Sequence, residues 1–454
     1  MKRKIFSSFI LTLLSSGLFF GFNFFIAKAL GAVVYGEINY YLSFIQIVVL
    51  LISFNYAGLY MGEKITKENE DSFSLFFTIE TLAFVILFIP LFFFISKFTN
   101  NYLISLLIMI IAYFLTIVGL IGLEFNSKKQ IPFSILYSVL IPRINLIIIY
   151  LLFILLNLAS AISYLFSYLF SLIIVATYFL SKFSPRIYFK KEIFQRAWKF
   201  YLLGIIGSSV TYIAQIFQKE FGSYEELASL AIGLLLISGL SLVGGILIKF
   251  ALPKIHEAWK FKNIEKIEEL YSTHTFLSSM INIPILIYLL FFIETLSIYI
   301  GDGYQYLPKI FYILSVGYLT DLLTGITGTI LRATENEHIE IYNEIFRFVI
   351  AISLLFFLKE TAFGIAYAIS ISMIVYNLVK FYQVYRLFGI KPIRKKNFFV
   401  LLLFSILLSL CFVGIFLLEF DKKLMIIISL FCMVVLYSYV FFYIKKSINL
   451  GIYT

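Results

Sequence analysis

The sequence has 454 residues, of which 61% are hydrophobic and 13% are charged, and its mean hydropathy is +0.99. A soluble protein of this size could not bury so much apolar side chain, because most of its surface must be wetted. The composition excludes a soluble enzyme and a disordered chain and predicts an all-α polytopic membrane protein. In this class of protein, a formal charge of +11 indicates positively charged cytoplasmic loops rather than a nucleic-acid partner.

Fourteen apolar segments follow one another along the chain, each close to the roughly 20 residues that a membrane-spanning helix needs. The first follows Met1-Lys2-Arg3-Lys4 and is longer than the apolar core of a cleaved signal peptide, so we expect an uncleaved helix. The predicted spans are 5–28, 37–60, 73–96, 102–124, 132–156, 159–181, 198–217, 227–250, 273–293, 308–331, 341–358, 362–383, 398–418 and 424–444.

The basic residues are distributed unevenly between the predicted loops. Counted with the N-terminus inside, 25 of the 36 Lys and Arg residues fall in inside loops and 7 in outside loops. Because cytoplasmic loops carry the excess of positive charge, this bias predicts that both termini lie in the cytoplasm. The other four basic residues fall within predicted spans, and they are Arg143, Lys199, Arg347 and Lys380.

A weak internal repeat divides the chain. The first span is followed by residues 30–37 (LGAVVYGE), and the seventh by residues 221–228 (FGSYEELA), which places Tyr35 and Tyr224 189 residues apart. Transporters are commonly built from such repeats, with the substrate site between them. We expect two pseudo-symmetric six-helix lobes and two additional helices, with the boundaries 1–181, 182–390 and 391–454.

The repeat motif also carries a family resemblance. Residues 30–48 (LGAVVYGEINYYLSFIQIV) resemble the start of the polysaccharide flippases, the O-antigen/teichoic-acid exporters of the multidrug/oligosaccharidyl-lipid/polysaccharide (MOP) superfamily. Residues 252–271 and 282–319 are similar to the second half of that family, in which a Pro-marked inside loop, a second Pro and a Gly-Tyr outside turn recur. Residues 322–345 match the helix pair that follows. The resemblance runs over almost the whole chain, and its weight lies in the order and spacing of the pieces.

The resemblance implies a MATE-like flippase in a bacterial inner membrane. Such proteins move an undecaprenyl-pyrophosphate-linked oligosaccharide between leaflets by alternating access between two lobes. The implied partners are this lipid-linked oligosaccharide, membrane lipids and other polysaccharide assembly proteins, with no nucleic acid. No cofactor is implied, and coupling to H⁺ or Na⁺ would drive the cycle. The sequence shows no Gly-rich phosphate-binding loop that would indicate direct use of ATP.

Polar residues within the spans are the candidate substrate ligands, because charge in a membrane is costly. Arg143 lies half-way along the fifth span, where its guanidinium would bind a pyrophosphate; the alternative is a buried partner for a carboxylate or for carbonyls freed by Pro142. Further candidates, each with an alternative of helix pairing or snorkelling, are Lys28, Arg347, Asn23 and Asn55.

Two carboxylates within spans are candidates for ion coupling. Asp321 lies half-way along the tenth span and would bind a proton or Na⁺, with a structural hydrogen bond as the alternative. Glu80 in the third span has the same two interpretations. His256, His274 and His338 have no partner at the spacing of metal ligands, so the sequence predicts no metal site.

Two other functions compete with the flippase. A multidrug exporter of the same superfamily would have the same architecture. A membrane enzyme of polysaccharide assembly would need a sizeable outside loop or a cytoplasmic catalytic domain, and the predicted loops have room for neither. The sequence therefore favours a transporter over an enzyme.

Overall fold

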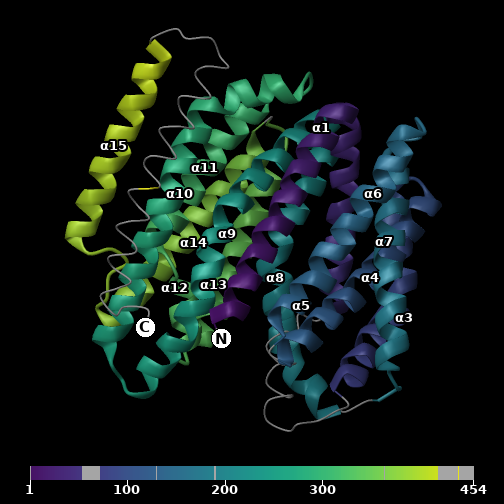
Figure 1. Cartoon of the computed structure of the whole chain (residues 1–454), viewed down its shortest axis with the longest axis horizontal. Helices are drawn as coiled ribbons and strands as arrows, with labels where there is room; N and C mark the ends of the chain where they lie inside the picture. Colours follow the sequence, from purple (N-terminus) through teal and green to yellow (C-terminus); the bar gives the residue numbers. More distant parts are fainter. Residues whose placement is uncertain are drawn as a thin grey trace. The chain divides into compact units, whose positions relative to one another are not determined.

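A computed structural model of the chain describes residues 2–53, 72–128, 130–188, 191–361, 363–417 and 438. Those residues are helical almost throughout and contain no β-strand (Figure 1). Ten of their helices are long and apolar enough to cross a membrane, and the bent pair of α11 and α12 makes eleven if it counts as one span. The predicted all-α polytopic fold is confirmed. The predicted span 424–444 falls outside the described residues, apart from residue 438.

The chain divides into two compact units. Unit 1 comprises residues 1–231, 300–304 and 359–365, and unit 2 comprises residues 232–299, 305–358 and 366–454. This division falls within α9, because α8 packs against α1 in unit 1. The predicted boundaries at 181 and 390 follow the sequence repeat rather than packing, and they stay a prediction.

Unit 1 is a helical bundle in which α3, α4, α7 and α6 lie side by side in that order. A π-helical turn, η1, joins α5 to α6. The helices of unit 1 are α1 (Lys2–Ser53), α3 (Ser72–Thr99), α4 (Tyr102–Ser127), α5 (Ile131–Ile135), η1 (Leu136–Leu140), α6 (Ile141–Leu155), α7 (Ala161–Phe183), α8 (Lys191–Phe221) and the start of α9 (Tyr224–Lys260).

Helix α1 combines two predicted spans and folds back at Gly31. The backbone of Gly31 has φ 79° and ψ 171°, a conformation that favours glycine. In a straight helix, Asn23 and Tyr35 would lie roughly 18 Å apart. Instead, the Tyr35 hydroxyl donates a hydrogen bond of 3.1 Å to Oδ1 of Asn23. The chain therefore reverses at the predicted break between the first two spans.

The two halves of the sequence repeat meet in unit 1. Gly36, in the first motif, lies so close to the backbone carbonyl of Tyr224, in the second, that a Cβ at position 36 would clash with it. Beside this contact, the hydroxyl of Tyr40 donates to Glu220 at 2.5 Å, and the ammonium of Lys219 lies 4.8 Å from the Tyr40 ring centre. The glycine in the YGE motif thus permits a close approach of α1 to the start of α9.

Unit 2 surrounds a broken span. Helix α11 ends at Gly325, which has φ 66°, and α12 follows at an angle of 43°. Side chains of the neighbouring helices bond the carbonyls of α11: Ser279 of α10 donates to Leu322, and Ser370 of α14 donates to Ile313. The helices of unit 2 are the rest of α9, α10 (Ile264–Ile300), α11 (Leu307–Thr324), α12 (Thr327–Ala333), α13 (Glu337–Leu358), α14 (Gly364–Phe388) and α15 (Lys395–Leu417).

Candidate functional site

A polar cavity of about 340 Å³ lies within unit 2, in the middle of otherwise apolar helices. We call it the polar cavity. Titratable side chains along its walls come from α10, α11, α12, α13 and α14, and those of α11, α13 and α14 include Asp321, Glu340, Glu344, Tyr376 and Lys380. Charged groups are rarely placed in a membrane without a functional or pairing reason, so this cavity is the first candidate for a functional site.

Helical spacing brings the charged side chains together. Glu340, Glu344 and Arg347 are four and three residues apart on α13, so they lie along one face of that helix. Tyr376 and Lys380 are four residues apart on α14 and face them. Each helix therefore contributes one polar stripe to the cavity.

Tyr376 lies at the centre of two ion pairs. Its hydroxyl contacts Oε1 of Glu344 and lies 3.3 Å from Oε1 of Glu340. Lys380 Nζ lies 3.9 Å from the same Glu340 oxygen and 3.7 Å from the Tyr376 ring centre. Arg347 Nε lies 3.3 Å from Oε2 of Glu344. Each glutamate thus has its own cation, and the tyrosine ring and hydroxyl connect the two pairs.

Asp321 is the third carboxylate of the cavity. It lies in the last turn of α11, where its backbone carbonyl accepts a hydrogen bond from Gly325. Within the described parts of the chain, no Lys or Arg nitrogen lies within the 4.0 Å of a salt bridge to its carboxylate. Asp321, Glu340 and Glu344 carry three negative charges, and Lys380 and Arg347 carry two positive ones, so one negative charge has no inner cation. Arg332 also lines the cavity, as an exposed side chain.

Further polar atoms of the cavity walls have no hydrogen-bond partner among the described residues. They include Nδ1 of His274 and Oε2 of Glu340, and both residues are at most 5% exposed. The Tyr318 hydroxyl and Oε2 of Glu344 also accept or donate no hydrogen bond there, although the latter lies in the ion pair with Arg347. The other ring nitrogen of His274 lies 3.3 Å from the carbonyl of Gly244. A buried polar atom without a partner costs about 1–3 kcal/mol. The walls therefore favour a polar occupant such as a hydrated proton or a small cation.

Unit 1 contains a different charged site around Arg143. Its Nη1 donates to the carbonyl oxygen of Ser15 at 3.0 Å and to the Ser15 hydroxyl at 2.9 Å, and its Cζ lies 4.4 Å from the Phe19 ring centre. No carboxylate of the described chain lies within salt-bridge distance of this guanidinium. The carbonyl that it binds belongs to α1 rather than to the turn before Pro142. Arg143 therefore keeps an unneutralised positive charge and further N–H donors.

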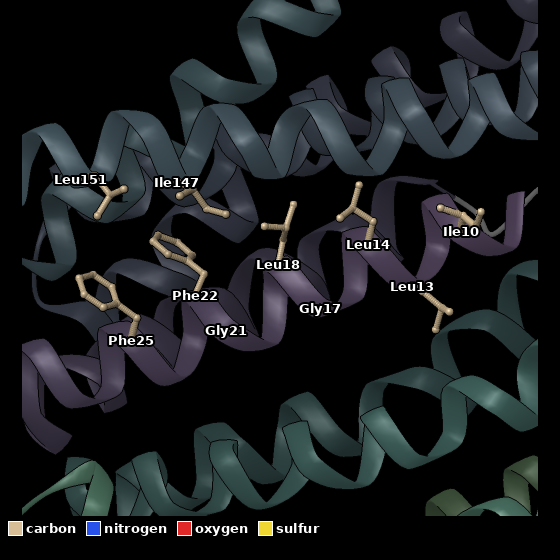
Figure 2. A pocket seen from close by; sticks show the side chains of 10 residues that line it. All are labelled: Ile10, Leu13, Leu14, Gly17, Leu18, Gly21, Phe22, Phe25, Ile147 and Leu151. Carbon is tan, nitrogen blue, oxygen red and sulfur yellow. The ribbon is translucent and has the colours of Figure 1, made fainter. Parts of the chain in front are cut away.

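An apolar groove of about 850 Å³ lies between α1 and α6 (Figure 2). It is near Arg143, whose contacts Ser15 and Phe19 belong to the same stretch of α1. We call it the α1–α6 groove. Leu14, Leu18 and Phe22 of α1 face Ile147 and Leu151 of α6 across it. The sequence analysis predicted no such groove, because exposed apolar residues of a membrane helix look alike whether they face lipid or a binding site.

The structure brings only two of the predicted site residues into one site. Asp321 lines the polar cavity, and Arg347 pairs with Glu344 at its wall, whereas Arg143 belongs to unit 1. Glu80, on α3 of unit 1, is 4% exposed, and its Oε2 has no hydrogen-bond partner among the described residues. Sequence reasoning missed Glu340, Tyr376, Lys380 and His274 as members of the cavity.

The other three predicted substrate ligands have different surroundings. Asn23 is 7% exposed, donates to the carbonyl of Phe19 at 2.8 Å and accepts from Tyr35, so its amide stabilises the turn at Gly31. Lys28 is exposed near that turn. Asn55 lies outside the described residues.

Comparison with solved structures identifies the fold. No family model matches the chain, and no curated protein is similar to it. The lipid II flippase MurJ in an inward closed conformation matches with a TM-score of 0.74 and 17% identity, over 97% of this chain and 99% of that one. A multidrug resistance MATE transporter of the MOP superfamily, inward-facing, matches with a TM-score of 0.63 and 13% identity, over 84% and 94%.

The chain has the fold of these transporters. A MOP superfamily transporter from Pyrococcus furiosus is a third neighbour, with a TM-score of 0.58 and 12% identity over 85% of this chain and 94% of that one. The MATE-like architecture that the sequence resemblance implies is therefore confirmed. The neighbours are transporters and flippases rather than enzymes, and at these identities the likeness shows that this chain shares their fold.

Proposed function

We propose that the protein is a flippase for an undecaprenyl-pyrophosphate-linked oligosaccharide, such as the repeat unit of O-antigen or a similar surface polysaccharide. One observation carries this choice: the match to the lipid II flippase covers nearly the whole of both chains at a TM-score of 0.74, whereas the MATE match covers 84% of this chain at 0.63. The protein would lie in the bacterial inner membrane with both termini cytoplasmic, and other polysaccharide assembly proteins would supply its substrate.

In this proposal Arg143 contacts the pyrophosphate during transit. A guanidinium can donate two parallel hydrogen bonds to phosphate oxygens, and the hydrogen bonds of Arg143 within the described chain use only Nη1. Its charge faces no carboxylate in the described structure, so an anionic head group would neutralise it. Lys28 would offer a second contact at the outer end of the first half of α1, and Arg347 and Asn55 stay further candidates.

The polar cavity would couple transport to H⁺ or Na⁺. The unmatched negative charge at Asp321 can be neutralised by one proton or one monovalent cation. Lys380 faces the same carboxylates, so neutralisation of Asp321 would change the balance of charges on α11 relative to α13 and α14. With such a change, two conformations of the protein would bind the ion with different affinities, and coupling of ion binding to transport requires this difference. Glu80 is a second candidate for the same role.

The test is transport in proteoliposomes that contain the full chain and a fluorescent lipid-linked oligosaccharide. Flipping is measured by the fraction of label that an impermeant quencher reaches with time. We expect Arg143→Ala to lower flipping roughly 10- to 100-fold, since a hydrogen bond to a charged group contributes about 1.5–3 kcal/mol. Lys182→Ala, an exposed cation at the end of α7, is the matched control and should flip normally. Wild-type vesicles that flip no faster than protein-free vesicles, under either ion gradient, contradict the flippase.

A multidrug exporter is the second candidate, because the MATE transporters share the fold over most of their length. It predicts that overexpression protects cells against apolar cations and that deletion leaves surface polysaccharide intact. The flippase predicts the reverse pattern, namely loss of surface polysaccharide and unchanged drug sensitivity. Measuring both phenotypes in one deletion strain separates the two functions.

A further inference from the structure

Two glycines form the floor of the α1–α6 groove. Gly17 and Gly21 are exposed, and a Cβ built on either would have no neighbouring atom within 4 Å. Spaced four residues apart, such glycines usually let two membrane helices pack closely. Here they contact no helix of the described chain, and they instead deepen the space between Leu14 and Leu18 on one side and Ile147 on the other.

The dimensions of the groove favour an extended chain. Its lining on α1 runs from Ile10 to Phe25, which is roughly 22 Å of helix axis. That is most of the ~30 Å thickness of the hydrocarbon core of a bilayer. A hydrocarbon chain parallel to the helices fits such a long groove better than a compact apolar molecule does.

The positive charge of Arg143 indicates which kind of hydrocarbon chain the groove would bind. Arg143 lies one turn before Ile147 and two turns before Leu151 on the same face of α6, and its contacts Ser15 and Phe19 lie within Ile10–Phe25, the stretch of α1 from which other residues line the groove. Along α1, the groove thus extends to both sides of the residues that hold a cation with no carboxylate partner in the described chain. An apolar helix of a second copy would cover the walls but leave this charge unbalanced.

The depth of Arg143 separates two sources of anionic lipid. It is near the middle of the 25-residue span Ile131–Leu155, so its guanidinium lies near the middle of the hydrocarbon core. Phosphates of resident bilayer lipids lie outside that core. Only a lipid whose head group is being carried across the membrane would place a phosphate at this depth.

From these observations we propose that the α1–α6 groove binds the hydrocarbon chain of the transported lipid, an isoprenoid-type chain ending in a phosphate that contacts Arg143. The chain would occupy the half of the groove on one side of Arg143 before the phosphate crosses and the other half afterwards. This inference rests on the proposed flippase function, and it assigns the place of the lipid tail.

Photolabelling tests the groove directly. The full chain is reconstituted in phospholipid vesicles with a polyprenyl phosphate that carries a diazirine in its chain, and labelled peptides are mapped by mass spectrometry after illumination. We expect labels concentrated in residues 10–25 and 147–151, and at least tenfold suppression by excess unlabelled polyprenyl phosphate. Gly17→Phe with Gly21→Phe, which fills the floor, should also lower labelling at least tenfold. Gly119→Phe is the matched control, because Gly119 is exposed on α4 and equally open, and it should label as the wild type does.

Three outcomes overturn the proposal. The first is labelling spread evenly over exposed membrane helices such as α3 and α13. The second is a diazirine phospholipid that labels the groove as strongly and resists competition. The third is a photocrosslinked dimer joined through α1, which would identify a second copy as the occupant. The wild-type map decides the matter even if the double variant fails to fold.

The same vesicles separate this proposal from the proposed function. Flipping of the fluorescent lipid-linked oligosaccharide without groove labelling would overturn the groove and leave the flippase. Competed groove labelling without flipping would support the binding site and contradict the flippase. Uncharged polyprenol in place of the phosphate should lose most of the competition, since Arg143 then has no anion to bind.

Discussion

In unit 2 three carboxylates gather at one polar cavity with the inner cations Lys380 and Arg347, and Arg332 is an exposed lining residue. In unit 1 the guanidinium of Arg143 has no carboxylate partner in the described chain and contacts α1 close to an apolar groove. Both arrangements place charge in the membrane, where it is costly. The first offsets this cost by internal pairing and leaves a single charge to be titrated or bound. The second offsets part of it by the Ser15 carbonyl and hydroxyl and leaves a cation for an external anion. On this contrast we propose ion coupling in unit 2 and lipid binding in unit 1.

The largest expected effect on stability comes from Lys380 and tests the internal pairing of charges in unit 2. Lys380→Met would leave Glu340 without its cation and raise the unmatched charge of the polar cavity to two. Removing one partner of a buried ion pair typically costs about 3–5 kcal/mol, so we expect a large drop in the thermal unfolding temperature. Lys266→Met, on the half-exposed pair with Glu269, should cost below about 1 kcal/mol. Thermal unfolding of both variants in the same detergent is the measurement.

A rescue variant sharpens that prediction. Glu340→Gln combined with Lys380→Met removes both charges of the pair, so most of the lost stability should return. If Lys380→Met alone unfolds within about 1 kcal/mol of the wild type, the ammonium does not neutralise the cavity, and the internal pairing assigned to unit 2 is wrong.

A smaller effect concerns the unmatched charge itself. Asp321→Asn keeps the shape of the side chain and removes the negative charge, so we expect a folded protein whose flipping no longer responds to an imposed H⁺ or Na⁺ gradient. Coupling free energies are typically about 1–3 kcal/mol, so the gradient should stimulate the wild type by roughly 5- to 150-fold and the variant hardly at all. Asp302→Asn, at the exposed turn between α10 and α11, is the control. An equal response of Asp321→Asn and wild type would move the coupling site elsewhere, with Glu80 as the next candidate.

Hydropathy predicted most of the fold, because about 20 apolar residues in lipid leave the backbone no alternative to a helix. The break at Gly31 was predicted between two spans, but the break at Gly325 was not. Residues 308–331 are apolar enough to read as one helix, and the bend depends on the glycine's backbone conformation between α11 and α12.

The site was only partly predictable for a related reason. Asp321 and Arg143 stood out because each is an isolated charge in an apolar segment. Lys380 fell within a predicted span, and Glu340 was placed just outside one, so nothing local indicated that they meet. Their pairing depends on which faces of α13 and α14 turn toward each other, which is a tertiary property that periodicity within one helix does not encode.

The smallest effect tests whether the two ion pairs of the polar cavity act as one network. Tyr376→Phe removes the hydroxyl that lies between Glu340 and Glu344 and keeps the ring on which Lys380 rests. We expect a loss of about 1–3 kcal/mol, because the hydrogen bond has a charged acceptor. Tyr382→Phe, 60% exposed on the same helix, should change stability by a few tenths at most. A double-mutant cycle of Tyr376→Phe with Lys380→Met gives the coupling energy. A coupling energy of about 0.5–3 kcal/mol supports a single network. Additive effects would show that each glutamate is neutralised by its own cation. In that case, neutralising Asp321 would not affect α13 through Tyr376.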